Sequence, residues 1–297
     1  MNARDGLLAA LCFELVPMKG VEAAIADLAP ASTVSVTCSP AKGLGATLDV
    51  AGRLLDLGHD AVPHLAARQV EDREHVARLA AWIRRSGLRE VVVIAGDAPR
   101  PAGSYVDTIS FLRDLFEHDT GLERVGVGAY PDGHPAIDRA TLHEALHAKQ
   151  ALLAAAGVRG SATTQMCFEA KRIRTWLSVE RCEGFTMPVT VGIPGVVDRG
   201  RLLKVGMRIG VGASLRYLRK NRAAMSALLA PGGYDPTELV TAVASDAGEL
   251  GVTALHSYTF NCVAETRAWQ QSLLSARSTA TDSPGFLQSD RPLEGPI

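Results

Sequence analysis

The stretch Ala10-Leu-Cys-Phe-Glu-Leu-Val-Pro17 decides how we interpret the fold of this chain. It is a short apolar run that a proline closes, which is typical of a strand buried on both faces of a parallel sheet. Its single acid, Glu14, is costly there, because burial disfavours the charged form of a carboxylate. We therefore expect Glu14 to have a function, and an ion pair that only holds the fold together is the alternative.

Similar runs return along the chain, each with one polar residue near its C-terminal end. They cover residues 34–37, 61–65, 91–97, 125–130 and 162–165. Two further strand-like runs lie at 188–193 and 253–259, and stretches with helical spacing separate the runs. Eight such strand–helix units predict a (β/α)8 TIM barrel in a single domain. The C-terminal strand ends meet at the active face of that fold, so we expect the polar residues to converge there.

We assign residues 1–276 to this barrel and expect the N-terminal residues to run straight into the first strand. Near the C-terminal end we expect a helical region over 201–229 and one helix over 236–250. Ser, Thr, Asp, Pro and Gly dominate from about Arg277, which predicts a disordered tail over 277–297. An open, doubly wound sheet is the alternative fold, but we find no G-x-G-x-x-G or Walker pattern after a strand.

The composition narrows the class of protein. The 297 residues are 47% hydrophobic and 21% charged, with a formal net charge of −1, so no global charge indicates a nucleic acid or an anionic membrane as partner. We find no apolar stretch long enough to span a bilayer and no signal-peptide layout, and we predict a cytoplasmic protein. The five cysteines are scattered and form no C-x-x-C pair, which indicates reduced thiols and no zinc site, and we predict no metal.

Three polar residues near strand ends are candidates for chemistry, and each is weighed against a plain structural role. Asp97 follows a glycine at the end of the fourth strand, where an aspartate that shapes a turn is common. His64 follows a proline in the third strand and, taken alone, is better explained as a core histidine. Gln165 in the sixth strand has few structural explanations, because a buried amide needs partners at both its oxygen and its nitrogen.

Other polar residues are more ambiguous. Tyr130 and His134 lie in the segment Tyr130-Pro-Asp-Gly-His134, which is also typical of a turn. His256 and Tyr258 in the eighth strand are equally consistent with core residues that have polar tips. The remaining histidines lie in helical or surface contexts, and we assign no role to His59, His75, His118, His143 and His147.

Seven short motifs occur in a fixed order along these strands. They are Phe13-Glu14, Ser35-Val-Thr37, Pro63-His64-Leu65, Gly96-Asp97, Ala129-Tyr-Pro131 with His134-Pro135, Thr164-Gln165, and His256 with Tyr258-Thr259 and Asn261. In this order, and each at an expected strand end, they resemble the methylenetetrahydrofolate reductase family. The resemblance extends from roughly Leu11 to Leu274, which is nearly all of the chain except the tail.

The resemblance implies reduction of 5,10-methylenetetrahydrofolate to 5-methyltetrahydrofolate on a (β/α)8 barrel. It implies that Glu14 is the general acid that opens the imidazolidine ring, and that Asp97 stabilises the iminium cation formed. Gln165 would bind the pterin edge, and Tyr258 would also contact the substrate. The positions that line the flavin in familiar members correspond here to Thr37, His64, Tyr130 and His134.

The chain departs from the family pattern mainly on the flavin side. Ala95 replaces the arginine that meets the flavin diphosphate, and Cys38 replaces a tyrosine. The helix after His134 lacks the usual acidic and basic set. These losses favour direct hydride transfer from NADH, or NADPH, to the folate, and count against FAD. Two alternatives stay open: an FAD-dependent enzyme with ping-pong kinetics, and a folate-binding barrel without turnover, against which the retained Glu14 and Asp97 argue.

Overall fold

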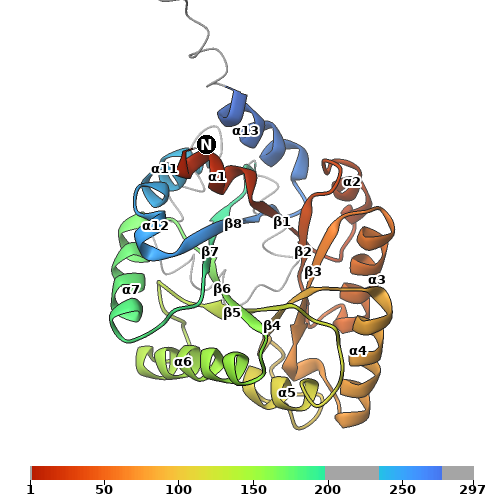
Figure 1. The fold of residues 1–297 in the computed structure, drawn as a ribbon. Coiled ribbons are helices and arrows are strands. Elements are labelled where there is room, and N and C mark those ends of the chain that lie inside the picture. The colour runs from red at the N-terminus through yellow and green to blue at the C-terminus, as the bar shows by residue number, and fades with distance from the viewer. Residues whose placement is uncertain (1, 198–233, 276–297) are drawn as a thin grey trace, which may run out of the picture.

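The computed structural model describes residues 2–197 and 234–275, which form a closed barrel of eight parallel strands inside a ring of helices (Figure 1). Each strand pairs with the next in the sequence, and β8 pairs with β1 to close the barrel. The strands are β1 (Leu11–Leu15), β2 (Thr33–Val36), β3 (Asp60–Ala66), β4 (Glu90–Ile94), β5 (Arg124–Ala129), β6 (Arg159–Met166), β7 (Val189–Pro194) and β8 (Val252–Tyr258). The prediction of a single (β/α)8 barrel is confirmed.

The helices surround the barrel. In the part of the chain that the structure describes, those between the strands are α2 (Val21–Ala26), α3 (Gly43–Asp56), α4 (Arg73–Ser86), α5 (Thr108–Leu115), α6 (Arg139–Ala155), α7 (Ala170–Cys182), α11 (Thr237–Ser245) and α12 (Ala247–Leu250), with the short 3-10 helix η1 (Ala67–Gln69) after β3. Helix α1 (Ala3–Ala9) precedes β1, and α13 (Val263–Ser275) follows β8. Within the described residues, no helix has both the length and the apolar character that a membrane crossing needs.

Local sequence signals explain where the helices begin and end. Asp72 caps α4, because its carboxylate accepts the backbone N–H of His75, and Gly87 ends the helix in the left-handed region with φ 68°. Asp107 and Asp138 cap α5 and α6 in the same way. The helix ends therefore lie close to the polar and glycine residues that mark them in the sequence.

Two expectations about the ends of the barrel are wrong. The chain does not run straight into β1, since Asn2 caps α1 and the helix buries Leu7 and Leu8 against the barrel. The single helix expected over 236–250 is two helices, because the backbone leaves helical geometry at Asp246, whose carboxylate pairs with Arg174 on α7. The helical region expected over 201–229 and the tail over 277–297 lie outside the described residues.

The closure of the barrel decides which side chains share its interior. In the pair β1–β8, Cys12 lies opposite His256, and in the pair β1–β2, Glu14 lies opposite Ser35. Alternate residues of a strand point to the same face, so Cys12 and Glu14 share one face of β1. Polar residues that are 242 positions apart in the chain, Glu14 and His256, are thereby brought within hydrogen-bond distance.

Candidate active site

A cavity of about 240 Å³ opens at the C-terminal ends of the strands. All eight residues that the sequence singled out as catalytic, substrate-binding or cofactor-binding line it: Glu14, Thr37, His64, Asp97, Tyr130, His134, Gln165 and Tyr258. They come from β1, β3, β6, β8 and the loops that follow β2, β4 and β5. This convergence makes the cavity the candidate active site, while the role of each residue stays a prediction.

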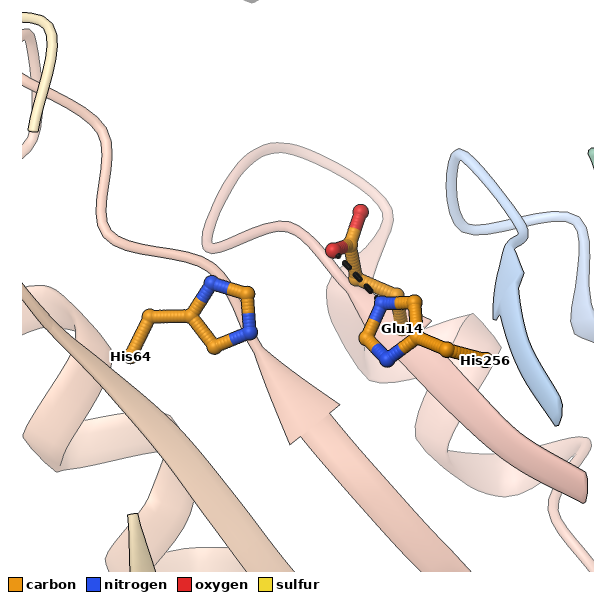
Figure 2. A group of neighbouring side chains, drawn as sticks. All are labelled: Glu14, His64 and His256. Atoms are coloured by element: carbon orange, nitrogen blue, oxygen red, sulfur yellow. Dashed lines mark hydrogen bonds and ion pairs between the residues drawn. The ribbon is translucent and has the colours of Figure 1, made fainter. Parts of the chain in front are cut away.

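Glu14 and His256 form a buried pair at the inner edge of this cavity. Only 5% of Glu14 and 2% of His256 is exposed, and Glu14 Oε2 lies 2.9 Å from His256 Nε2 (Figure 2). Burial alone would lower the pKa of His256, but the hydrogen bonds and negative charges of Cys12 and Glu14 raise it to about 10. His256 is therefore protonated at neutral pH.

His64 faces the same pair from β3. Figure 2 shows its ring beside that of His256, and the two centroids are 6.1 Å apart with the planes 28° from parallel. Its Nε2 lies 2.7 Å from the hydroxyl of Ser35. Burial, followed by the charge of His256, lowers the pKa of His64 to about 3. Of the two stacked imidazoles, His64 is thus neutral and His256 carries the proton.

Two side chains that follow β8 fix the position of Glu14 by bonding the backbone at the end of β1. The hydroxyl of Thr259 donates to the backbone oxygen of Glu14 at 2.5 Å. Asn261 bonds both backbone groups of Val16, accepting from its N–H at 2.8 Å and donating to its oxygen at 3.0 Å. Asn261 itself has φ 62°, a left-handed conformation that asparagine tolerates better than most residues. The backbone is therefore fixed both at Glu14, the candidate general acid, and at Val16, two residues later.

A bulge in β6 places Gln165. The pairing of β6 with β7 shifts register between Thr163 and Met166, so one extra residue is accommodated there. The backbone of Gly192 approaches so closely that a Cβ atom on it would lie 2.6 Å from the carbonyl oxygens of Thr164 and Gln165. A glycine at this position allows the bulge, and the bulge directs Gln165 into the cavity.

Two buried polar atoms on the cavity wall have no hydrogen-bond partner among the described residues. They are the side-chain nitrogen of Gln165 and the hydroxyl of Thr37. Buried donors without partners cost about 1–3 kcal/mol each, so native proteins seldom leave them without a bound partner. The amide of Gln165 and the hydroxyl of Thr37 thus indicate that the cavity accepts a polar ligand.

Tyr258 contributes to the cavity mainly through its ring. Its hydroxyl already donates to the backbone oxygen of Thr164 at 3.0 Å, and its ring meets that of His256 edge-on at 4.8 Å. Burial, and then the charge of Glu14, raises the pKa of Tyr258 well above its ordinary value. The phenol is therefore neutral and offers an aromatic wall beside Glu14.

Asp97 lies at the mouth of the cavity and is exposed to solvent. It follows Gly96, whose φ of 91° and close approach to the Cβ of Ala66 suit only glycine. Burial, and then the charge of Asp97, raises the pKa of Tyr130. The ring of Tyr130 packs edge-on against His134 at 5.3 Å. One negative charge thus lies beside an aromatic face at the entrance.

A larger groove of about 920 Å³ adjoins the cavity. The two share Ile94, Gly128, Ala129 and Tyr130 as lining residues. The described residues that line the cavity include no lysine or arginine, whereas four cationic residues line the groove: Arg139, Lys149, Lys171 and Arg172. Cationic side chains that can bind an anionic group therefore line the groove, together with the acids Asp107, Glu169 and Glu180, and do not line the cavity around Glu14.

One group of titratable side chains was not predicted from the sequence. His143 and His147 on α6 both contact Glu180 on α7, outside the barrel. A signal was present, since two histidines four residues apart share one face of a helix. Glu180 lies 33 residues after His147, and no local pattern connects the two helices at these positions.

Comparison with known proteins identifies the family. A family model described as methylenetetrahydrofolate reductase matches residues 24–206, which is more than half of the chain. The chain belongs to the methylenetetrahydrofolate reductase family. A 5,10-methylenetetrahydrofolate reductase from Pectobacterium carotovorum subsp. carotovorum is 27% identical over 144 residues, which are 47% of this chain and 44% of that relative. The chain therefore matches less than half the length of this curated relative.

The region that matches the family contains Thr37, His64, Asp97, Tyr130 and Gln165. The buried pair of Glu14 and His256 lies outside it and is linked to it through the closure of the barrel. The family resemblance that the motifs indicated is confirmed.

A solved structure from Clostridium thermocellum has a similar fold. Its TM-score is 0.57 over 90% of this chain and 95% of that chain, with 12% sequence identity. That protein is described as uncharacterized and as binding two copies of 5-methyl-5,6,7,8-tetrahydrofolic acid. At this identity the similarity shows a shared fold.

Proposed function

We propose that this protein reduces 5,10-methylenetetrahydrofolate to 5-methyltetrahydrofolate, and that NADH or NADPH gives its hydride directly to the folate. One observation carries the proposal: the buried carboxyl of Glu14, paired with His256, lies in the cavity that Gln165 lines with an unpaired amide nitrogen. Family membership supplies the reaction class, and this geometry supplies an acid beside a site for a polar ring.

The first step needs a proton at the nitrogen that leaves the methylene carbon. The proton carried by His256 passes to Glu14 across the 2.9 Å contact between Nε2 and Oε2. Glu14 donates it to this nitrogen, the carbon–nitrogen bond of the imidazolidine ring breaks, and an iminium cation forms. Because both residues are buried, the proton reaches the substrate without competition from bulk water.

The second step transfers a hydride to the iminium carbon. The donor loses its hydride and becomes the oxidised nicotinamide, and the methylene carbon becomes a methyl group. In this proposal Asp97 stabilises the positive charge that exists only between the two steps. Gln165 holds the pterin edge with its free N–H donors and its oxygen, and so keeps the reacting carbons within about 3–3.5 Å.

The arrangement of positive charge supports a nicotinamide donor in place of a resident flavin. The cavity around Glu14 has no cationic lining residue within the described chain, and Ala95 provides no guanidinium. Arg68 lies beside Ala95 in the structure, because its backbone N–H donates to the Ala95 oxygen at 2.9 Å. Its guanidinium, however, donates to the backbone oxygens of Ala98, Pro99 and Val106. We place the diphosphate of the dinucleotide in the adjoining groove, whose lysines and arginines suit it.

Initial rates of NADH oxidation, with the folate and NADH both varied, test this function. We expect intersecting double-reciprocal lines, a colourless protein, and deuterium from stereospecifically labelled NADH in the product methyl group. Stoichiometric FAD in the purified protein, or activity only after FAD is added, would refute direct transfer and support the ping-pong alternative. Folate binding without any turnover with NADH or NADPH would refute the reductase itself.

A further inference from the structure

A second cluster of ligand-type side chains joins two helices outside the barrel. α6 and α7 are neighbours in the outer ring (Figure 1), and His143 and His147 of α6 meet Glu180 of α7. The Nδ1 atom of His143 lies 2.8 Å from Glu180 Oε2, and the Nε2 atom of His147 lies 3.0 Å from the same oxygen. The two imidazole centroids are 4.3 Å apart. Three potential ligand atoms therefore point at one location.

Glu180 is an unusual residue for this position. Its side chain is only 7% exposed, and a carboxylate removed from water needs compensation by charge or hydrogen bonds. Within the described residues, the ion pairs of Glu180 are with the two histidines, and neither lysine nor arginine takes part. A histidine carries a positive charge at neutral pH only when its surroundings favour the protonated form. Two histidines therefore compensate a buried carboxylate less well than a lysine or an arginine, which is always charged.

We propose that His143, His147 and Glu180 bind a divalent transition-metal ion of the zinc class. Two imidazole nitrogens and one carboxylate oxygen form a ligand set that zinc sites with an open position use. The three ligand atoms all lie within 4.8 Å of one another. Tetrahedral coordination with bonds of about 2.0–2.1 Å separates ligand atoms by about 3.3 Å, so the contacts at 2.8 and 3.0 Å need to open only slightly.

The fourth ligand position is accessible. His143 and Glu180 line the groove of about 920 Å³, and the side chain of His143 is 36% exposed. Water or an anionic group in the groove can complete the coordination. Imidazole and carboxylate together favour zinc, nickel or copper over magnesium or calcium, which take oxygen ligands. The ion would link the two helices that follow β5 and β6; Tyr130 comes directly after β5, and Gln165 is part of β6.

A second set of side chains could also bind the metal ion, and the test has to distinguish it from the helix cluster. Glu14, His64 and His256 also place three ligand atoms within 4.8 Å of one another. That group belongs to the proposed active site, where the Nε2 atom of His64 already bonds Ser35. Binding of a metal at the helix cluster and binding at the active site must therefore be distinguished by variants of each.

The test uses the full-length protein, freed of metal with a chelator and titrated with Co²⁺, whose visible absorption reports coordination by nitrogen and oxygen. We expect about one Co²⁺ per chain, displaced by Zn²⁺, and a rise in the melting temperature on binding. His147→Ala and Glu180→Gln should each weaken binding at least about tenfold. His118→Ala, at an exposed histidine outside both clusters, should bind as the wild type does.

Other outcomes would overturn the proposal. Unchanged Co²⁺ affinity in His147→Ala, with loss of binding in His64→Ala, would place the ion in the active site. Absence of Co²⁺ binding at a concentration of about 1 mM would mean that the cluster only ties the helices together. If Glu180→Gln does not fold, His143→Ala is the replacement, because His143 is partly exposed and its loss leaves the pair of His147 and Glu180 intact.

Discussion

The substitution Glu14→Gln tests the buried pair through stability as well as through activity. Gln has the shape of Glu and can still accept from His256, but it removes the negative charge that favours the imidazolium. In the wild type the pKa of His256 is raised from 6.5 to about 10, with Glu14 and Cys12 as the causes that overcome burial. The substitution should therefore remove the part of the pH-dependent stability of His256 that Glu14 supplies, while the part that Cys12 supplies remains.

The sign and the size of the change in stability follow from the coupling between folding and proton binding at His256. A histidine whose pKa is higher in the folded state stabilises the protein fully below its unfolded value of 6.5, and this contribution is lost as the pH rises toward about 10. Each pH unit corresponds to about 1.4 kcal/mol, so the upper bound is roughly 5 kcal/mol. Since Cys12 also raises this pKa and remains in the variant, we expect a change well below that bound, of about 2 kcal/mol.

Urea unfolding followed by tryptophan fluorescence, at several pH values between 6.5 and 10, measures this effect. The difference in unfolding free energy between the wild type and Glu14→Gln should be largest near pH 6.5 and should shrink as the pH rises. Glu22→Gln is the matched control, because it makes the same chemical change in an exposed ion pair with Arg53. A difference that stays constant or grows with pH would refute the charge assignment of the pair.

Four further outcomes are expected. Glu14→Gln should lower kcat by about 10²–10⁴-fold with little change in folate binding, and a wild-type kcat at neutral pH would contradict its role as acid. Asp97→Asn should lower kcat more than it raises KM, whereas Gln165→Ala should mainly raise the folate KM. The opposite result in steady-state kinetics would mean that Asp97 positions the substrate and Gln165 stabilises the transition state. Gly96→Ala should lower stability by about 1–3 kcal/mol in thermal unfolding, since a Cβ there would lie 2.9 Å from that of Ala66. Gly45→Ala, in open space on a helix, is its control and should have little effect or stabilise.

The barrel and most of its strands could be predicted from the sequence, because the physical signals are local. A strand buried on both faces must be apolar along its length, so β1 and β4 stand out, and the polar residue at each strand end is visible. The cavity residues followed from fold geometry, since parallel strands place their C-terminal ends together. The hydrogen bond between Glu14 and His256 depends on the pairing of β1 with β8 that closes the barrel. A pattern of strands in the sequence does not specify which residues of these two strands face each other.

What the sequence did not predict depends on contacts between distant segments. Helix α1 is short, and its two leucines make it stable only where the barrel covers them. The break at Asp246 depends on its ion pair with Arg174 of α7, a residue 72 positions earlier. The bulge at Gln165 depends on the absence of a side chain on Gly192 of the neighbouring strand. Each of these outcomes is decided by a tertiary neighbour, against or beyond local preference.

The hydrogen bonds from Thr259 and Asn261 to the end of β1 determine when the chain can become active during its synthesis. Glu14 is synthesised before the imidazole of His256 and the amide of Asn261, which follow about 240 residues later. An emerging chain therefore has its acid long before it has a proton partner for it. Fragments that end before β8 should be inactive even when they contain the whole region that matches the family, and adding the missing C-terminal piece in trans should restore turnover only if it completes the barrel.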